Sequence, residues 1–156
     1  MNSWIKGLES IVREGEPLAM HTWFQIGGPA EFYAEPRGLD ELITLVTRCA
    51  QEEVPMHLLG RGSNVLVRDE GVPGVVIPLS DPEFRKIEID GNRVTAGGGA
   101  RLGRVVTTTA HSGLAGLENL VAIPGSIGGA LHGNAGAHGG NVGEWTAAAT
   151  CLTQHG

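Results

Sequence analysis

The first half of the chain mixes apolar residues at helical spacing with apolar residues at extended spacing. Residues 1–16 carry apolar side chains at the three- to four-residue spacing of an amphipathic helix, so a short helix is expected there. Residues 20–35 predict an extended segment that ends as a strand at Pro36. One continuous apolar face predicts the clearest helix of the chain over 39–53, ending before Pro55.

Three short apolar runs follow this helix. They predict strands over 56–59, 65–67 and 75–77, with a Gly- and Pro-containing turn over 70–74 before the last one. The expected order of elements in this half is therefore strand, helix, strand, loop, strand and strand. The aromatic pair Trp23-Phe24 is expected in the core, because large aromatic side chains are mostly buried.

The second half begins after a junction at 78–82. Alternating residues over 86–90 and 93–96, separated by Gly91-Asn92, predict a β-hairpin. No internal repeat is recognised along the chain.

Glycine dominates the last third of the chain. A second amphipathic helix is expected over 101–112, with Gly113 as its C-terminal stop. Beyond it the chain is loop-rich over 114–143, and 147–153 predict a final short strand. The chain has 25 glycines, and ten of them lie between positions 113 and 143. This density indicates either a loop-rich fold with tight turns, or backbone that lies directly against a ligand.

Composition excludes several classes of protein. The chain has 156 residues, 41% of them apolar, so it can bury a core as one domain or as two small ones. No apolar stretch approaches the roughly 20 residues of a membrane-spanning helix, and no secretory signal is recognised. The formal net charge of −6 disfavours a protein that coats nucleic acid or an anionic membrane. Two cysteines without a ligand cluster fit a reduced, cytoplasmic setting.

The first candidate site is a glycine-rich loop between two apolar runs. It consists of Gly60, Arg61, Gly62, Ser63 and Asn64. Its glycines allow close approach and positive φ, so successive N–H groups can converge on an anion such as a pyrophosphate. The serine and asparagine add donors, and the arginine could pair with phosphate or lie on the surface. The alternative is an ordinary tight turn with an Asx bend and no ligand.

Two further segments share this small and polar character. One contains Pro124, Gly125, Ser126, Gly128 and Gly129, and the other contains Asn134 and Gly136. Together with the first loop they could clamp opposite sides of one ligand, or each could merely permit tight local packing. His132 and His138 lack a recognisable third ligand, so no metal site is expected.

In their order and spacing, these segments resemble a known family. The matching stretches are 22–30, 60–67 with 74–77, 113–118, 123–130 and 134–137. They are similar to the opening motif, the pyrophosphate loop and the second flavin loop of UDP-N-acetylenolpyruvoylglucosamine reductase, also called UDP-N-acetylmuramate dehydrogenase. The resemblance covers residues 20–145 and is specific as a set.

This resemblance implies an α+β fold with a two-subdomain FAD-binding domain of the p-cresol methylhydroxylase and vanillyl-alcohol oxidase type. The implied units are an N-terminal helical segment over 1–19, one FAD-binding subdomain over 20–80 and a second, incomplete one over 81–156. The family's members are longer, and nothing here matches their substrate-binding domain, so a truncated version of the fold is expected.

The resemblance also implies a function in peptidoglycan-precursor synthesis in the bacterial cytoplasm. NADPH would reduce FAD, and the reduced flavin would pass a hydride to the enolpyruvyl double bond of a small UDP-sugar substrate. The pyrophosphate of FAD would lie on the first loop, and the flavin with its ribityl chain along the second and third segments. Neither a nucleic acid nor a membrane is an implied partner.

The family's catalytic arginine, serine and glutamate have no matching positions, so no catalytic residue is assigned in this chain. Two other interpretations stay open. The chain could be a flavin-binding module or fragment that performs no chemistry by itself, or part of another FAD oxidoreductase of the same superfamily.

Overall fold

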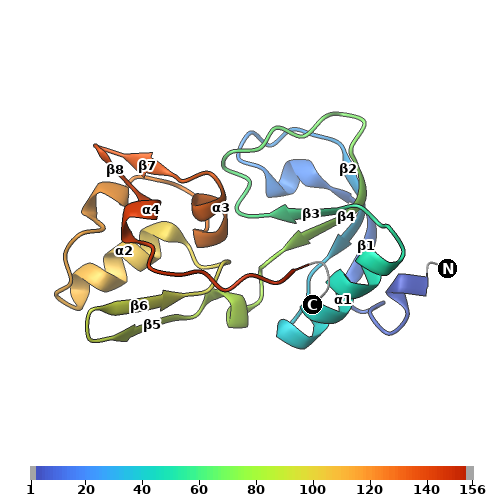
Figure 1. Ribbon diagram of the computed structural model, residues 1–156. Coiled ribbons are helices and arrows are strands. Elements are labelled where there is room, and N and C mark those ends of the chain that lie inside the picture. The colour runs from blue at the N-terminus through green and yellow to red at the C-terminus, as the bar shows by residue number, and fades with distance from the viewer. Residues whose placement is uncertain (1–2, 154–156) are drawn as a thin grey trace.

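The elements form two groups that lie next to each other, and the computed structural model describes residues 3–153 (Figure 1). The first group contains β1 (Val12–Pro17), β2 (Pro29–Ala34), α1 (Leu39–Gln51), β3 (Met56–Leu59) and β4 (Val72–Pro78). The second contains β5 (Ile87–Asp90), β6 (Arg93–Ala96), α2 (Leu102–His111), α3 (Ile127–His132), β7 (Gly136–Ala137), β8 (Gly140–Asn141) and α4 (Val142–Trp145). Short 3-10 helices are η1 (Ser3–Ile5), η2 (Leu18–His21), η3 (Pro82–Arg85) and η4 (Glu118–Leu120).

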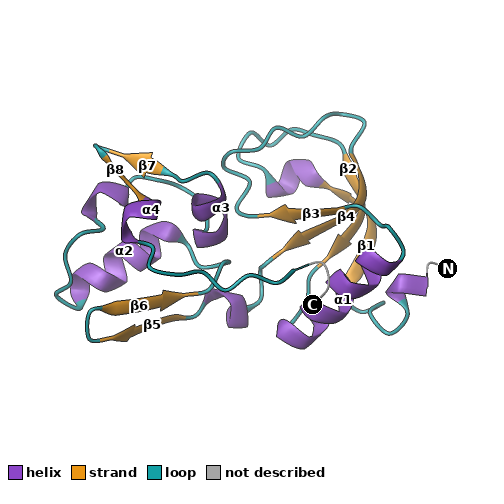
Figure 2. Ribbon diagram, in the orientation of Figure 1, coloured by secondary structure: helices purple, strands orange, loops and turns teal. Residues whose placement is uncertain are grey.

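The first group is built on a four-stranded sheet of order β1-β2-β4-β3. β1 pairs antiparallel with β2, whereas β2 and β3 both run parallel to β4. Parallel pairing needs a crossover connection, and α1 supplies it between β2 and β3 (Figure 2). The carboxyl ends of β3 and β4 point toward the second group (Figure 1). The loop that starts at Gly60 therefore begins at the side where the two groups meet.

α1 packs on the sheet through one apolar face. The buried residues of this face are Leu42, Leu45, Val46 and Cys49. They share a cluster with sheet residues and with the N-terminal segment, where the ring of Trp4 lies 5.1 Å edge-on from that of Phe32. This arrangement confirms the helix predicted over 39–53, which ends two residues early at Gln51.

A separate apolar cluster supports the second group. Its buried members are Leu102, Val106, Leu120, Ala130 and Val142. α2 confirms the second predicted helix, and Gly113 just beyond it has a φ of +76°, the conformation expected of a helix stop. The predicted hairpin is also confirmed, with β5 and β6 paired around Gly91.

The segment after α4 runs back to the first group (Figure 1). Residues 146–153 have no regular structure, so the strand predicted over 147–153 is wrong. Leu152 is half-buried and packs against the apolar cluster that contains Leu45 and Ile77. The tail therefore links the two groups through a side-chain contact.

The helix predicted over 1–16, and with it the helical segment expected over 1–19, is wrong within the described residues. Only η1 is helical before position 12, and a helix cannot continue through Gly7, whose φ is +80°. Residues from Val12 onward form β1, which pairs with β2. The apolar spacing was real, because Trp4, Leu8 and Ile11 are buried, but successive turns rather than a helix bring them to the core.

Two other expectations near the candidate site are wrong. Residues 65–67 form no strand, and the side chain of Leu66 is 73% exposed. Trp23 and Phe24 are also outside the core, with 64% and 62% of their surface exposed. The strand predicted over 75–77 is confirmed but starts earlier, at Val72, inside the turn expected over 70–74.

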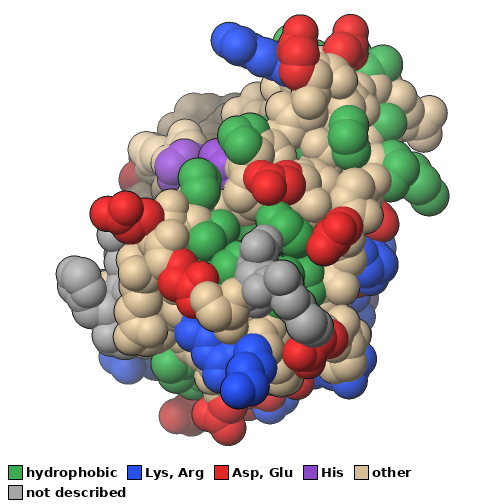
Figure 3. Space-filling model, turned by 90° about the vertical axis from the view of Figure 1, so that its right-hand side faces the viewer, with side chains coloured by type: hydrophobic (Ala, Val, Ile, Leu, Met, Phe, Trp, Pro, Cys, Tyr) green, Lys and Arg blue, Asp and Glu red, His purple; other side chains and the backbone are tan. Residues whose placement is uncertain are grey.

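The surface agrees with the mixed charge of the sequence. On the face at the right-hand end of Figure 1, which is drawn in Figure 3, acidic side chains are scattered rather than gathered in one patch. Among the described residues, no helix is both long enough and apolar enough to cross a bilayer.

Candidate cofactor-binding site

The two glycine-rich loops at 60–64 and 124–129, which are far apart in the sequence, are in contact. The hydroxyl of Ser63 donates a hydrogen bond to the carbonyl oxygen of Pro124 at 3.4 Å. A Cβ on Gly60 would lie 2.8 Å from Oγ of Ser126, and one on Gly125 would lie 3.2 Å from Oγ of Ser63. Each approach is closer than a side chain allows without a shift, so glycine at both positions lets the loops meet.

The first loop packs against the end of η2 and the segment that follows it. Gly62 has a φ of +65°, and its Cα faces the backbone of His21 and Thr22 so closely that no side chain would fit. The N–H of Trp23 donates to the carbonyl oxygen of Gly62 at 2.8 Å. The stretch identified as the opening motif is therefore a support of the loop, which explains why both belong to one pattern.

This support continues beyond the loop. The N–H of Gly28 donates to the carbonyl oxygen of Arg68 at 2.8 Å, and Gly27 faces the side chain of Val67. Thr22 is buried, and its hydroxyl donates to the carbonyl oxygen of Ile26 at 3.1 Å. Residues 22–28 and 62–68 thus run as a pair of packed irregular segments, which is why 65–67 need no sheet partner.

A polar cluster fixes the start of that support. Nε2 of His21 lies 2.8 Å from Oε1 of Glu16, and its Nδ1 lies 3.2 Å from the hydroxyl of Tyr33. The hydrogen bond from His21, with a smaller effect of Arg13, holds the pKa of Glu16 below its usual range. Burial raises the pKa of the Tyr33 phenol, so this hydroxyl stays protonated.

The second loop leads into α3, whose first N–H groups already have acceptors. Ile127 donates to the carbonyl oxygen of Ala100 at 2.8 Å, and Gly128 donates to that of Gly98 at 2.8 Å. The buried hydroxyl of Ser126 accepts from the N–H of Gly129 at 3.4 Å. The N-terminus of α3 therefore binds its own protein, and free donors for an anion must come from elsewhere.

The first loop supplies such donors. Within residues 3–153, no acceptor receives a hydrogen bond from the backbone N–H groups of Arg61, Gly62, Ser63 or Asn64. Four consecutive free N–H groups with a glycine at positive φ are the chemistry of an anion-binding nest. Together with the close glycine contacts to the second loop, this donor set fits the diphosphate of a dinucleotide.

Electrostatics at the loop are positive although the chain as a whole is acidic. The pKa of the Arg61 guanidinium is below its usual value, chiefly because partial burial disfavours the charge. The neighbouring charges of Arg101 and Arg85 lower it further. Sequence reasoning missed these two arginines, because Arg85 lies outside the glycine-rich loops and the glycine run 97–99 before Arg101 was interpreted only as the lead into a helix.

The third segment has its contacts within the second group. Asn134 has a φ of +42°, and its Oδ1 accepts from the N–H of Gly143 at 3.0 Å. Gly136 pairs in the small β7–β8 hairpin with Asn141. No hydrogen bond in the described structure joins either residue to the loop at 60–64. Residues 3–153 also contain no group of three His, Cys, Asp or Glu side chains that could hold a metal ion.

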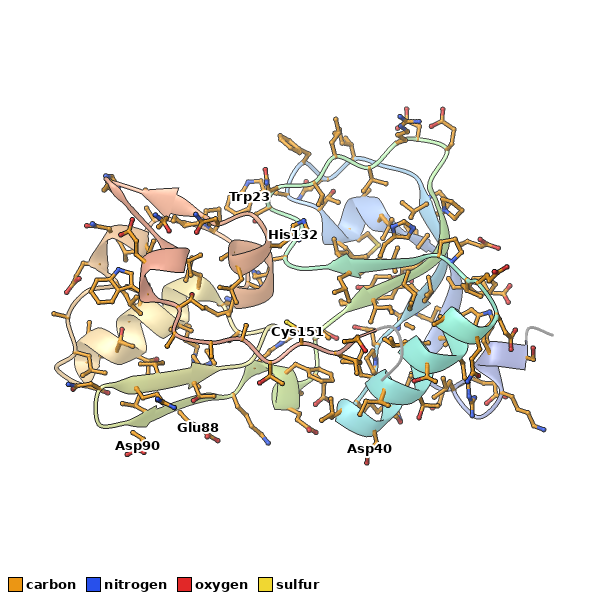
Figure 4. The ribbon with its side chains drawn as sticks, in the orientation of Figure 1. Trp23, Asp40, Glu88, Asp90, His132 and Cys151 are labelled. Atoms are coloured by element: carbon orange, nitrogen blue, oxygen red, sulfur yellow. The ribbon has the colours of Figure 1, made fainter. Side chains whose placement is uncertain are left out.

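Exposed aromatic and imidazole side chains stand near the junction of the groups. Figure 4 draws Trp23, from the segment after η2, and His132, from the end of α3, at the boundary between the two halves of the ribbon. Trp23 is tied to the first loop through its N–H bond to Gly62.

Comparison with known proteins assigns the chain to a family. A family model described as an FAD binding domain matches residues 30–156. The chain belongs to this FAD-binding domain family, and the expected α+β FAD-binding fold is confirmed.

More specific similarity points to one enzyme. The chain is 47% identical over 134 residues to the UDP-N-acetylenolpyruvoylglucosamine reductase of Rhodopirellula baltica, covering 86% of this chain and 44% of that protein. The crystal structure of the corresponding reductase from Thermus caldophilus has a TM-score of 0.69 and 39% identity, covering 83% of this chain and 45% of that one. The resemblance to the FAD-binding part of these reductases is thereby confirmed. The chain spans about half the length of the curated relatives it matches.

A more distant solved structure shares the fold alone. Alkyldihydroxyacetonephosphate synthase has a TM-score of 0.64 at 17% identity, covering 92% of this chain and 31% of its own.

Proposed function

We propose that this chain binds FAD in the contact region of the loops at 60–64 and 124–129. The observation that carries the proposal is the approach of Gly60 to Ser126, beside four N–H groups that have no protein acceptor among the described residues. The proposal places the diphosphate on Gly60, Arg61, Gly62, Ser63 and Asn64. It places the flavin and its ribityl chain along Pro124, Gly125, Ser126, Gly128 and Gly129, and extends them toward Asn134 and Gly136.

The proposed activity is the one for which the similar reductases are named. The chain would form the flavin-binding portion of a UDP-N-acetylenolpyruvoylglucosamine reductase, with NADPH as the reductant, a UDP-sugar as the substrate and the cytoplasm as its location. Bound FAD supplies the hydride-transfer chemistry. The buried members of the two apolar clusters fall on either side of position 80, which supports the proposed boundary between FAD-binding subdomains at 20–80 and 81–156, although residues 4–11 also pack in the first cluster.

The role of this chain's own residues is to bind and orient. The free N–H groups at 61–64 give the diphosphate hydrogen bonds without adding net charge, and they sit on a loop held rigid by residues 21–23. The second loop is fixed independently by the bonds of α3 to Gly98 and Ala100. A ligand that touches both loops is therefore held between two preorganised walls.

Gly60→Ala tests this arrangement. The added methyl group meets only Oγ of Ser126, at 2.8 Å, so either this hydroxyl leaves the N–H of Gly129 or the loops separate there. We expect FAD affinity, measured by titration of flavin fluorescence on the full chain, to fall by at least about tenfold. Adding Ser126→Ala removes the obstructing atom, and the double variant should regain part of the affinity.

Gly133→Ala is the matched control, because its methyl group would approach only the carbonyl oxygen of Gly129, at 3.7 Å, an ordinary contact. The proposal is overturned if the unaltered chain binds no FAD. It is also overturned if Gly60→Ala binds FAD as tightly as Gly133→Ala does. Oxidation of NADPH in the presence of the UDP-sugar then tells a catalytic chain from a flavin-binding module that performs no chemistry by itself.

A further inference from the structure

Three arginines beside the candidate site have no protein partner among residues 3–153. Arg61 lies on the first loop, Arg85 ends η3, and Arg101 precedes α2. In the part of the chain that the structure describes, none of the three side chains makes a hydrogen bond or an ion pair with the protein. Arg13, by contrast, binds both Glu16 and Glu35.

Backbone contacts place all three at one junction. Arg61 follows Gly60, which faces Ser126, and Arg101 is the antiparallel bridge partner of that same serine. The bridge is closed by the N–H of Leu102 donating to Gly125 at 3.2 Å and by the bond from Ile127 to Ala100. Arg61 and Arg101 therefore flank the line along which the two loops meet.

Arg85 is placed near the junction by backbone contacts between η3 and the glycine run 97–99. The N–H of Gly99 donates to the carbonyl oxygen of Phe84 at 2.9 Å, and a Cβ on Gly97 would lie 3.2 Å from the backbone nitrogen of Arg85. The next residue of the run, Gly98, accepts from Gly128 of α3. The charges of Arg85 and Arg101 lie close enough to Arg61 to act on its ionisation.

All three arginines are exposed, so water and salt weaken their mutual repulsion, but an anion placed among them would still be attracted. Like charges that face one another without a counter-charge raise the free energy of the folded chain. A chain with a net charge of −6 has carboxylates available, yet none lies on these arginines within the described structure. A dianionic ligand at the neighbouring nest would remove the repulsion and gain charge-assisted hydrogen bonds.

We propose that Arg85 and Arg101 join Arg61 in binding the diphosphate of the dinucleotide held by the loops. This inference rests on the proposed function and adds two binding residues to it. The backbone N–H groups at 61–64 orient the phosphates, and the three guanidinium groups neutralise their charge. A phosphate ester on a second nucleotide such as NADPH has the same chemistry, so the test must tell the two sources apart.

The test compares the double variant Arg85→Gln/Arg101→Gln with the unaltered full chain. FAD affinity, followed by flavin fluorescence, should weaken about 10- to 100-fold, and its dependence on salt should become shallower. Riboflavin, which has the same ring but no phosphate, should bind the two proteins equally. Arg85→Lys/Arg101→Lys keeps the charge and should retain most of the FAD affinity.

Lys6→Gln/Arg93→Gln is the matched control, because it removes the same charge from two exposed positions on other segments. Equal FAD affinity in the glutamine variant and this control overturns the inference. So does an equal loss for riboflavin, which would indicate structural damage, or a loss for NADPH with FAD unaffected. If the unaltered chain binds no FAD, the proposed function itself fails, and that result is distinct from the others.

Discussion

Ser63 shows how a single residue of the site is constrained. Its hydroxyl bridges to Pro124, and the Oγ atom lies where a Cβ on Gly125 would almost touch it. Its own N–H is one of the four that have no acceptor in the part of the protein that the structure describes. The side chain therefore holds the second loop while the backbone faces the proposed diphosphate.

Ser63→Asp should abolish FAD binding. A carboxylate about 4 Å from a phosphate costs about 4 kcal/mol at an effective dielectric constant near 20, which corresponds to a loss of two to three orders of magnitude in affinity. The measurement is FAD retention through gel filtration, read from the visible spectrum. Ser63→Asn has the same shape without the charge and should lose much less. Retained yellow colour in the aspartate variant would remove Ser63 from the diphosphate site.

Gly60 and Gly62 differ in how well their structural roles could be predicted from the sequence. Position 62 requires glycine for two reasons: its φ is positive, and the backbone of His21 leaves no space for a side chain. Position 60 requires glycine only because a side chain there would collide with Ser126, which is 66 positions away in the sequence. Local spacing predicts the first kind of constraint, since it belongs to a turn. The second kind is long-range: the shared character of the two loops left contact with one ligand as one of two alternatives, and the family resemblance then favoured it.

At the scale of elements, the bond between Glu16 on β1 and His21 at the end of η2 anchors the segment beneath the first loop. The pKa of Glu16 is depressed in the folded chain, mainly by this bond and then by Arg13. A depressed carboxyl pKa stabilises the fold above the unfolded-state pKa, and this contribution is lost as the pH falls through the folded-state value.

Glu16→Gln should therefore flatten the acid limb of the stability curve. Between about pH 5 and pH 3, the free energy of unfolding should fall less steeply in this variant than in the unaltered chain. Urea unfolding at a series of pH values measures the slope. Glu14→Gln, an exposed carboxylate on the same strand, serves as the control and should keep the original slope. Identical slopes in all three proteins would show that the pair contributes nothing to acid stability.

Elements with a complete local signal were predicted, and elements defined by tertiary contacts were not. α1 has an apolar face, acidic residues in its first turn and a proline beyond its end, so its pattern has one solution. Residues 65–67 have the apolar composition of a strand, but they pair irregularly with 27–28 instead. The N-terminal spacing fits a helix, yet Gly7 and the pairing of β1 override it. In both cases contacts with a segment distant in the sequence, rather than local preference, determine the backbone conformation.

At the scale of the whole molecule, the site depends on how the two groups are held together. Each group has its own apolar cluster, and between them lie the loop contacts at 60–64 and 124–129. The tail adds a second connection, because Leu152 packs on the cluster of the first group after the chain has passed through the second. Two connections at different places restrict hinge motion more than one does, and a ligand between preorganised walls benefits from that restriction.

Leu152→Ala tests whether the tail contributes to this arrangement. The side chain is half-buried, so its truncation should lower the free energy of unfolding by about 1–2 kcal/mol, less than a fully buried leucine would lose. Urea unfolding gives that value, and FAD titration of the same variant should show a smaller, separate loss of affinity because the groups are less firmly held. Thr150→Ala, exposed on the same tail, should change neither quantity. A stability loss with unchanged FAD affinity would mean that the loop contacts alone position the two walls, and no loss of either would mean that the tail does not hold the groups together.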